Sequence, residues 1–195
     1  MARKKKILLH IGPNPSAVSD LHARLASEQA LLDGVGHRVA EVDQCDLDRA
    51  KHEMLRTHKD AGLKRREVDG AWARICRALL RSRADLLLSQ PDFTRADDAQ
   101  VALILDGLAG LDVHVVVTPS DDEEPDDLVA RWSARLREGR VHVAPLGQDA
   151  APVDLAEELV GIALCIQHAE LDTRITKLKK RRKGVRSRIA LREAS

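Results

Sequence analysis

Short apolar runs alternate with helix-periodic segments along the chain, and this alternation constrains the fold more than any other feature. Ile7–Ile11, Asp85–Ser89 and Val113–Thr118 are rich in Leu, Ile or Val, which is typical of strands buried on both faces. His37–Val42 and Val141–Val143 are weaker candidates of the same kind. Because right-handed crossovers join parallel strands through helices, the pattern predicts a three-layer α/β/α domain with a mostly parallel sheet of about five strands.

The segments between these runs carry the apolar spacing of helices. The long charged segment is expected to be divided at Gly62 and Gly70, and Pro152 is expected to begin a long C-terminal helix. The other expected helices cover residues 16–32, 46–82, 95–109 and 128–136. The predicted organisation is an α/β domain over residues 1–150 and a basic helical tail over residues 151–195.

Aromatic side chains are almost absent from the chain. Trp72, Phe93 and Trp132 are its aromatic residues, and it has no Tyr. Proteins that stack nucleobases or sugars need a surface of aromatic rings, and three rings in 195 residues are too few to build one. The core is therefore expected to be aliphatic.

The cysteines and the hydropathy pattern indicate a cytoplasmic protein. Cys45, Cys76 and Cys165 are widely spaced and form no CxxC pair, which fits reduced thiols better than a disulfide framework or a zinc site. No stretch approaches the roughly 18 apolar residues of a membrane span. The apolar run that follows the basic N-terminus is too short for a signal peptide.

Several polar residues near strand ends are candidates for chemistry. His10 lies at the end of the first strand, where it is a weak candidate general base or a packed residue. Asp43 follows the second strand, where it can contact a ribose or, as we favour, cap a helix. His114 and His142 alternate with valines, and no carboxylate is spaced to orient them. We therefore expect no metal site.

The amino-terminal segment resembles a known family. The run Lys6–Pro13, the Gly34-Val35-Gly36 that follows a Leu-Leu pair, and the strand Val113–Thr118 followed by Pro119-Ser120-Asp121 are similar to bacterial sulfotransferase-like P-loop proteins. The resemblance covers residues 6–138. It implies a P-loop nucleoside-triphosphate-hydrolase-like fold and a 3′-phosphoadenosine 5′-phosphosulfate donor. The phosphate-site positions that it implies are Gly12, Ser16, Ser19 and Ser120.

The departures from this family predict a degenerate site. Pro15 stands at the family's lysine position, and proline has neither a charge nor an N–H group. Ala17 replaces the glycine, Val18 replaces one hydroxyl residue, and Ser120 replaces the arginine that holds the donor's 3′-phosphate. We therefore expect a non-catalytic protein without a cofactor. The alternative is an active sulfotransferase that uses the same donor through an altered loop.

The C-terminal tail is strongly basic. Between residues 177 and 188, eight of twelve residues are cationic, a density that can contact nucleic acid or an anionic membrane surface. A solvated, frayed helix broken near Gly184 is an equally weighted interpretation, and a helix-pair or coiled-coil contact through the Leu155–Ala169 stripe is a third. The expected anion-contacting residues are Lys177, Lys179, Lys180, Arg181, Arg182, Lys183, Arg186 and Arg188.

Overall fold

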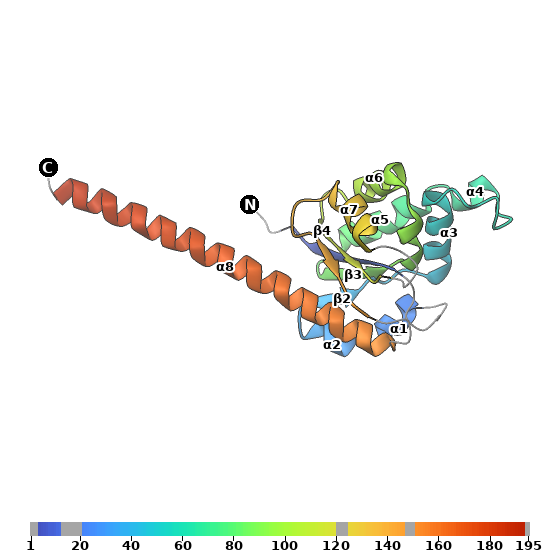
Figure 1. The fold of residues 1–195 in the computed structure, drawn as a ribbon, viewed down its shortest axis with the longest axis horizontal. Helices are drawn as coiled ribbons and strands as arrows, with labels where there is room; N and C mark the ends of the chain where they lie inside the picture. The colour runs from blue at the N-terminus through green and yellow to red at the C-terminus, as the bar shows by residue number, and fades with distance from the viewer. Residues whose placement is uncertain (1–3, 13–20, 120–124, 147–150, 194–195) are drawn as a thin grey trace. The chain divides into compact units, whose positions relative to one another are not determined.

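A computed structural model describes residues 4–12, 21–119, 125–146 and 151–193 of the chain. It contains one five-stranded sheet whose neighbouring strands are all parallel, in the order β2-β3-β1-β4-β5 (Figure 1). The α/β class and the parallel sheet predicted from the sequence are thereby confirmed. The strands are β1 (Lys6–Ile11), β2 (His37–Val39), β3 (Asp85–Ser89), β4 (Asp112–Val117) and β5 (Val141–Val143).

The strand register gives the sheet two chemically different faces. Ile7 pairs with Leu86 and Val113, so one face is aliphatic across the three central strands. His10 pairs with Ser89 on one side and Val116 on the other, so the opposite face carries polar side chains even though its central part is buried. Side chains alternate between faces along each strand, so the two faces are interleaved in the sequence.

Four principal helices pack on the aliphatic face. Their apolar side chains form one cluster with Ile7, Leu9 and Ile11 of β1. Trp72 and Phe93 meet edge to face at 5.4 Å in this cluster, which supplies most of the buried area that stabilises the fold. The helical segments on this side are α3 (Gln44–Met54), α4 (Arg65–Val68), α5 (Ala71–Arg81), η1 (Pro91–Arg95), α6 (Asp98–Gly107) and α7 (Pro125–Ser133).

Two short helices, α1 (Leu21–Ser27) and α2 (Gln29–Asp33), lie against β2 and β3 on the other side of the sheet (Figure 1). The final helix, α8, runs from Pro152 to Glu193. The chain divides into two compact units, Met1–Val160 and Gly161–Ser195. The first turns of α8 therefore belong to the same unit as the sheet, and Leu155 and Leu159 are fully buried there.

Four sequence-based boundaries are corrected. The helix expected over residues 16–32 is interrupted at Glu28 within its described part, and the helix expected over 95–109 begins at Asp98, after the separate η1 turn. The second strand ends at Val39, because the Val42 amide donates to the Ala40 carbonyl in a turn. The main chain of α8 continues as a helix through Gly184, so the expected break there is wrong.

Candidate functional site

The carboxyl ends of β1 and β4 meet where the chain reverses its direction of progress across the sheet. Connections leave β1 toward β2 on one side and β4 toward β5 on the other, and ligands of open α/β sheets bind at such a switch point. Gly12 ends β1 with a φ of 138°, and a Cβ there would lie 2.3 Å from the Thr118 carbonyl oxygen. The contact therefore requires glycine. Three of the predicted phosphate-site residues, Ser16, Ser19 and Ser120, lie outside the described residues.

A row of hydrogen bonds runs across the sheet just below this edge. The His10 ring is fully buried, with Nδ1 2.9 Å from the Ser89 hydroxyl and Nε2 2.9 Å from the Thr118 hydroxyl. Burial lowers the pKa of His10 to about 4, so the ring is neutral and donates to one hydroxyl while it accepts from the other. With both nitrogens engaged and no exposed surface, His10 holds three strands together and offers no free nitrogen to a substrate.

A second buried histidine ties α1 to the sheet. His22 Nε2 lies 2.8 Å from the Ala40 carbonyl oxygen, and an oxygen acceptor requires that this nitrogen carry the proton. Nδ1 then accepts from the Ser89 amide at 3.3 Å. Burial lowers the pKa of His22, so this ring is also neutral. No sequence pattern points to this contact, because His22 lies in a helical segment far along the chain from Ser89.

The amino end of the sheet holds a pair of histidines. The rings of His114 and His142 stack with centroids 5.2 Å apart, and His114 Nδ1 lies 3.0 Å from His142 Nε2. Arg140 contacts Asp112 at 2.9 Å and donates to His114 Nε2. Since arginine only donates, His114 carries its proton on Nδ1 and passes that hydrogen bond to His142.

The environment keeps this histidine pair neutral. Burial, assisted by the nearby Arg140 charge, lowers the pKa of His114 to about 3, and the same two causes lower the pKa of His142. The Asp112 carboxylate lies 3.9 Å from His114 Nε2, too far for a hydrogen bond, and it reaches the ring only through Arg140. Among the described residues, no three His, Cys, Asp or Glu side chains gather as metal ligands.

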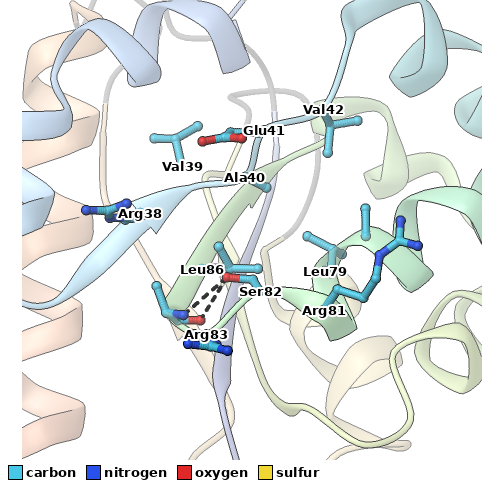
Figure 2. A pocket seen from close by; sticks show the side chains of 12 residues that line it. Arg38, Val39, Ala40, Glu41, Val42, Leu79, Arg81, Ser82, Arg83 and Leu86 are labelled. Carbon is cyan, nitrogen blue, oxygen red and sulfur yellow. Dashed lines mark hydrogen bonds between the residues drawn. The ribbon is translucent and has the colours of Figure 1, made fainter.

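The edge strand β2 is flanked by a hollow that the sequence did not reveal. A cavity of about 660 Å³ lies between β2, the segment that follows it, and the end of α5 (Figure 2). Its apolar part includes Leu79 and Leu86, and three arginines surround it: Arg38, Arg81 and Arg83. A smaller hollow of about 540 Å³ lies on the α1–α2 side of the same strand. The three arginines are exposed, as is Glu41 in the same lining, and Arg38 lies 3.9 Å from the Asp33 carboxylate.

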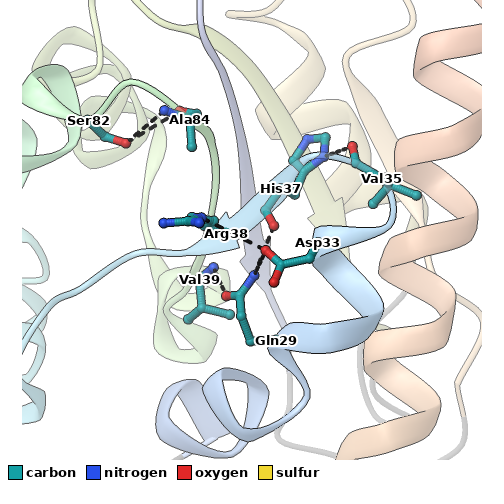
Figure 3. A network of polar contacts seen from close by, with 8 residues as sticks. All are labelled: Gln29, Asp33, Val35, His37, Arg38, Val39, Ser82 and Ala84. Carbon is teal, nitrogen blue, oxygen red and sulfur yellow. Dashed lines mark hydrogen bonds and ion pairs between the residues drawn. The ribbon is translucent and has the colours of Figure 1, made fainter.

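The side chain of Gln29 closes the free edge of β2 (Figure 3). Its Nε2 donates to the His37 carbonyl at 3.1 Å, and its Oε1 accepts from the Val39 amide at 2.9 Å. These are the two bonds that a neighbouring parallel strand would make to β2. Nε2 also donates to Asp33 at 2.9 Å, which fixes the amide orientation. Gln29 therefore blocks the addition of another strand at this edge.

The polar residues after β2 cap a helix. Asp43 accepts from the Cys45 amide at the start of α3, as the sequence predicts, and Asp46 forms ion pairs with Arg49 and Arg74. All three cysteines are free, with Cys76 buried. These groups stabilise the domain and leave the strand edges and the tail as the candidate binding regions.

The basic tail is an exposed part of α8. Every side chain from Leu171 to Lys180 is exposed, and so is Arg182. Four of the predicted anion-contacting residues are therefore open to solvent: Lys177, Lys179, Lys180 and Arg182. The side chains of the other four lie outside the described part: Arg181, Lys183, Arg186 and Arg188.

Comparisons with known proteins give no family for the chain. No protein-family model matches it, and a search of curated proteins finds no match. Within the described ranges, no helix combines the length and the apolar character needed to span a membrane.

Proposed function

We propose that this chain is a non-catalytic α/β protein that binds an anionic partner through the basic segment of α8, defined as residues 171–193. The observation that carries the proposal is the complete exposure of Leu171–Lys180 together with Arg182. No ion pair neutralises the described cations of this segment, since none of them has a carboxylate partner within 4.0 Å among the described residues. An exposed cationic helix attracts phosphate or carboxylate groups over a distance set by the salt concentration.

The cations of the basic segment are closely spaced along α8. Between residues 177 and 188 the sequence places eight cations on continuous helix. Since such a helix presents charge on all sides, it can contact an extended anion along its length.

The proposed fold family is a sulfotransferase-like P-loop protein with a degenerate phosphate loop. The central position of β1, whose carboxyl end lies at the switch point, supports this proposal. Pro15 and Ser120 supply no cation where the family's lysine and arginine hold the donor. Loss of one preorganised charge contact removes about 2.7–4 kcal/mol of transition-state stabilisation, so loss of both accounts for an inactive site.

Charge reversal on the tail tests the binding function. Full-length protein with Lys177, Lys179, Lys180 and Arg182 replaced by Glu is compared with the native chain for binding to a labelled single-stranded oligonucleotide, a non-specific polyanion. The matched control reverses four exposed cations of the α/β domain: Lys59, Arg66, Arg77 and Arg83. The tail variant should bind at least about tenfold more weakly, and the control within about twofold. Equal losses of affinity in both variants would show that the tail is not the binding site.

The second candidate is a working sulfotransferase, favoured by the location of the carboxyl end of β1 at the switch point. Its donor would be 3′-phosphoadenosine 5′-phosphosulfate. Calorimetric titration with adenosine 3′,5′-bisphosphate separates the two candidates, because a non-catalytic protein should show no micromolar affinity. A saturable micromolar isotherm would establish donor binding and reject the non-catalytic proposal.

A further inference from the structure

Helix α8 carries two apolar stripes on opposite sides. The residues of the first stripe are buried: Leu155, Leu159, Ile162 and Ile166. The residues of the second stripe are exposed by 51, 53, 46 and 63%, respectively: Leu164, Leu171, Ile175 and Leu178. Each of Leu164, Leu171 and Ile175 lies nine residues after a member of the first stripe. At about 100° per residue this separation is half a turn, so the second stripe does not continue the first.

The second stripe has the spacing of a coiled-coil seam. Leu164, Leu171 and Leu178 recur every seven residues, and Ile175 lies between them at the alternating spacing of four and three. His168 occupies the position equivalent to Ile175 one heptad earlier and Arg182 the position one heptad later, so the apolar pattern ends at Leu178. Leucine at one seam position with isoleucine at the other, as at Leu171, Ile175 and Leu178, is the pattern of two-stranded coiled coils. We name residues 164–178 the seam.

Two of the three charged residues beside the seam are cations, and they set the choice of partner. Arg174 precedes Ile175, Lys179 follows Leu178, and Asp172 is the acidic exception. In a parallel pair of identical helices, Arg174 would face Lys179 of the other copy. Such like-charged contacts across the seam disfavour a second copy of this chain.

A lipid surface fits the seam less well than a helix does. Interfacial helices present a wide apolar arc with Trp, Phe or Leu, whereas the positions flanking this stripe include Asp172, Arg174 and Lys179. A stripe of two positions in seven is the narrower seam of a coiled coil. Nucleic acid would contact the cations and leave the leucines exposed.

We propose that the seam binds an acidic amphipathic helix of a partner protein, with the seam residues packed against its apolar stripe and Arg174 and Lys179 paired with its flanking carboxylates. The inference rests on the proposed function, since it names the chemistry of the anionic partner. Helix binding requires the apolar residues of the seam and the two flanking cations. Simple anion contact requires only positive charge on the basic segment.

The test uses full-length protein and a labelled acidic peptide of about four heptads with Ile and Leu at its seam positions and Glu at both flanks. A peptide of the same composition with a permuted order is the control ligand. The variant Leu171→Ser/Leu178→Ser should bind the heptad peptide at least about tenfold more weakly while its oligonucleotide binding stays unchanged. The permuted peptide should show at least about tenfold weaker binding to the native chain.

A matched pair of charge variants locates the contact on the helix. Arg174→Glu/Lys179→Glu alters the flanks of the seam, and Lys177→Glu/Lys180→Glu makes the same charge change away from them. The first should weaken heptad-peptide binding by at least about tenfold, and the second by less than about threefold. If the native chain bound both peptides equally, or if both charge variants lost the same affinity, the proposed helix-binding role of the seam would be rejected. The proposal that the basic segment binds anions would be unaffected.

Two further readouts identify a different occupant. Sedimentation that shows a dimer of the native chain, lost in Leu171→Ser/Leu178→Ser, would assign the seam to a second copy. Binding to phosphatidylserine vesicles that is lost in the same variant, without heptad-peptide binding, would assign it to a membrane. Either result would reject the acidic helix. Loss of all anion binding in every assay would instead reject the proposed function itself.

Discussion

Replacement of His10 by leucine should change the pH dependence of folding in a defined way. His10 is fully buried between the hydroxyls of Ser89 and Thr118, and burial lowers its pKa to about 4. At pH 7.5 the variant loses both hydrogen bonds and leaves two buried hydroxyls without this partner. The expected cost is about 1–3 kcal/mol of unfolding free energy.

The sign of the pH effect follows from where the proton binds. Unfolded His10 protonates near pH 6.5, whereas the folded ring stays neutral until about pH 4, so the unfolded chain binds the extra proton in this window. Native stability therefore falls as the pH falls from 6.5 toward 4. The contribution at pH 4.5 is about 2–3 kcal/mol, and leucine carries no such penalty.

Urea denaturation followed by tryptophan fluorescence measures this difference, because Trp72 and Trp132 are both buried. All other histidines are the same in both proteins, so their contributions cancel in the comparison. The destabilisation caused by His10→Leu should shrink by about 2–3 kcal/mol between pH 7.5 and pH 4.5. A destabilisation that stays constant over this range would refute the buried, neutral His10.

Three substitutions, one of them with a matched control, test other parts of the fold by urea denaturation. Gln29→Leu removes the side chain that pairs with the free edge of β2, so the unfolding free energy should fall by about 1–3 kcal/mol. The exposed strand edge should also increase aggregation, measured as light scattering at high protein concentration. Unchanged values of both would contradict the role of Gln29 at this edge. Gly12→Ala should lower the unfolding free energy by at least about 3 kcal/mol, because the added Cβ clashes with Thr118. Gly139→Ala is the control: Gly139 has a φ of 72° with open space around it, so the loss should be about 1 kcal/mol. Similar losses in the two variants would refute the close contact. Trp72→Phe removes a hydrogen bond to a carbonyl of α6 and should cost about 1–3 kcal/mol, measured by circular dichroism; a neutral result would show that the bond adds nothing.

The strands were predictable because burial on both faces selects continuous apolar runs. The expected limits of β3 and β5 agree with the structure, and Ile7–Ile11 differs from β1 by one residue, Lys6. Lys6 is charged in sequence but buried in the sheet, where it lies 4.0 Å from Asp85. Local apolar patterning cannot reveal such a long-range ion pair.

The misplaced helix ends and the unexpected contacts have the same origin in tertiary structure. The helix expected to reach Leu32 without interruption breaks at Glu28, and Gln29 then turns its amide onto the edge of β2. His114 and His142 meet because β4 and β5 are neighbours, a fact that their separation of 28 residues hides. The cavity beside β2 likewise depends on α5, which comes from a distant part of the sequence.

The salt dependence of polyanion binding tests the role of the α8 cations most directly. The logarithm of the association constant of the native chain for a single-stranded oligonucleotide should fall linearly with the logarithm of the salt concentration. Neutralising Lys177, Lys179, Lys180 and Arg182 with glutamine should lower the magnitude of that slope by about 0.7 for each cation that contacts a phosphate. A slope identical to that of the native chain would mean that the anion binds elsewhere.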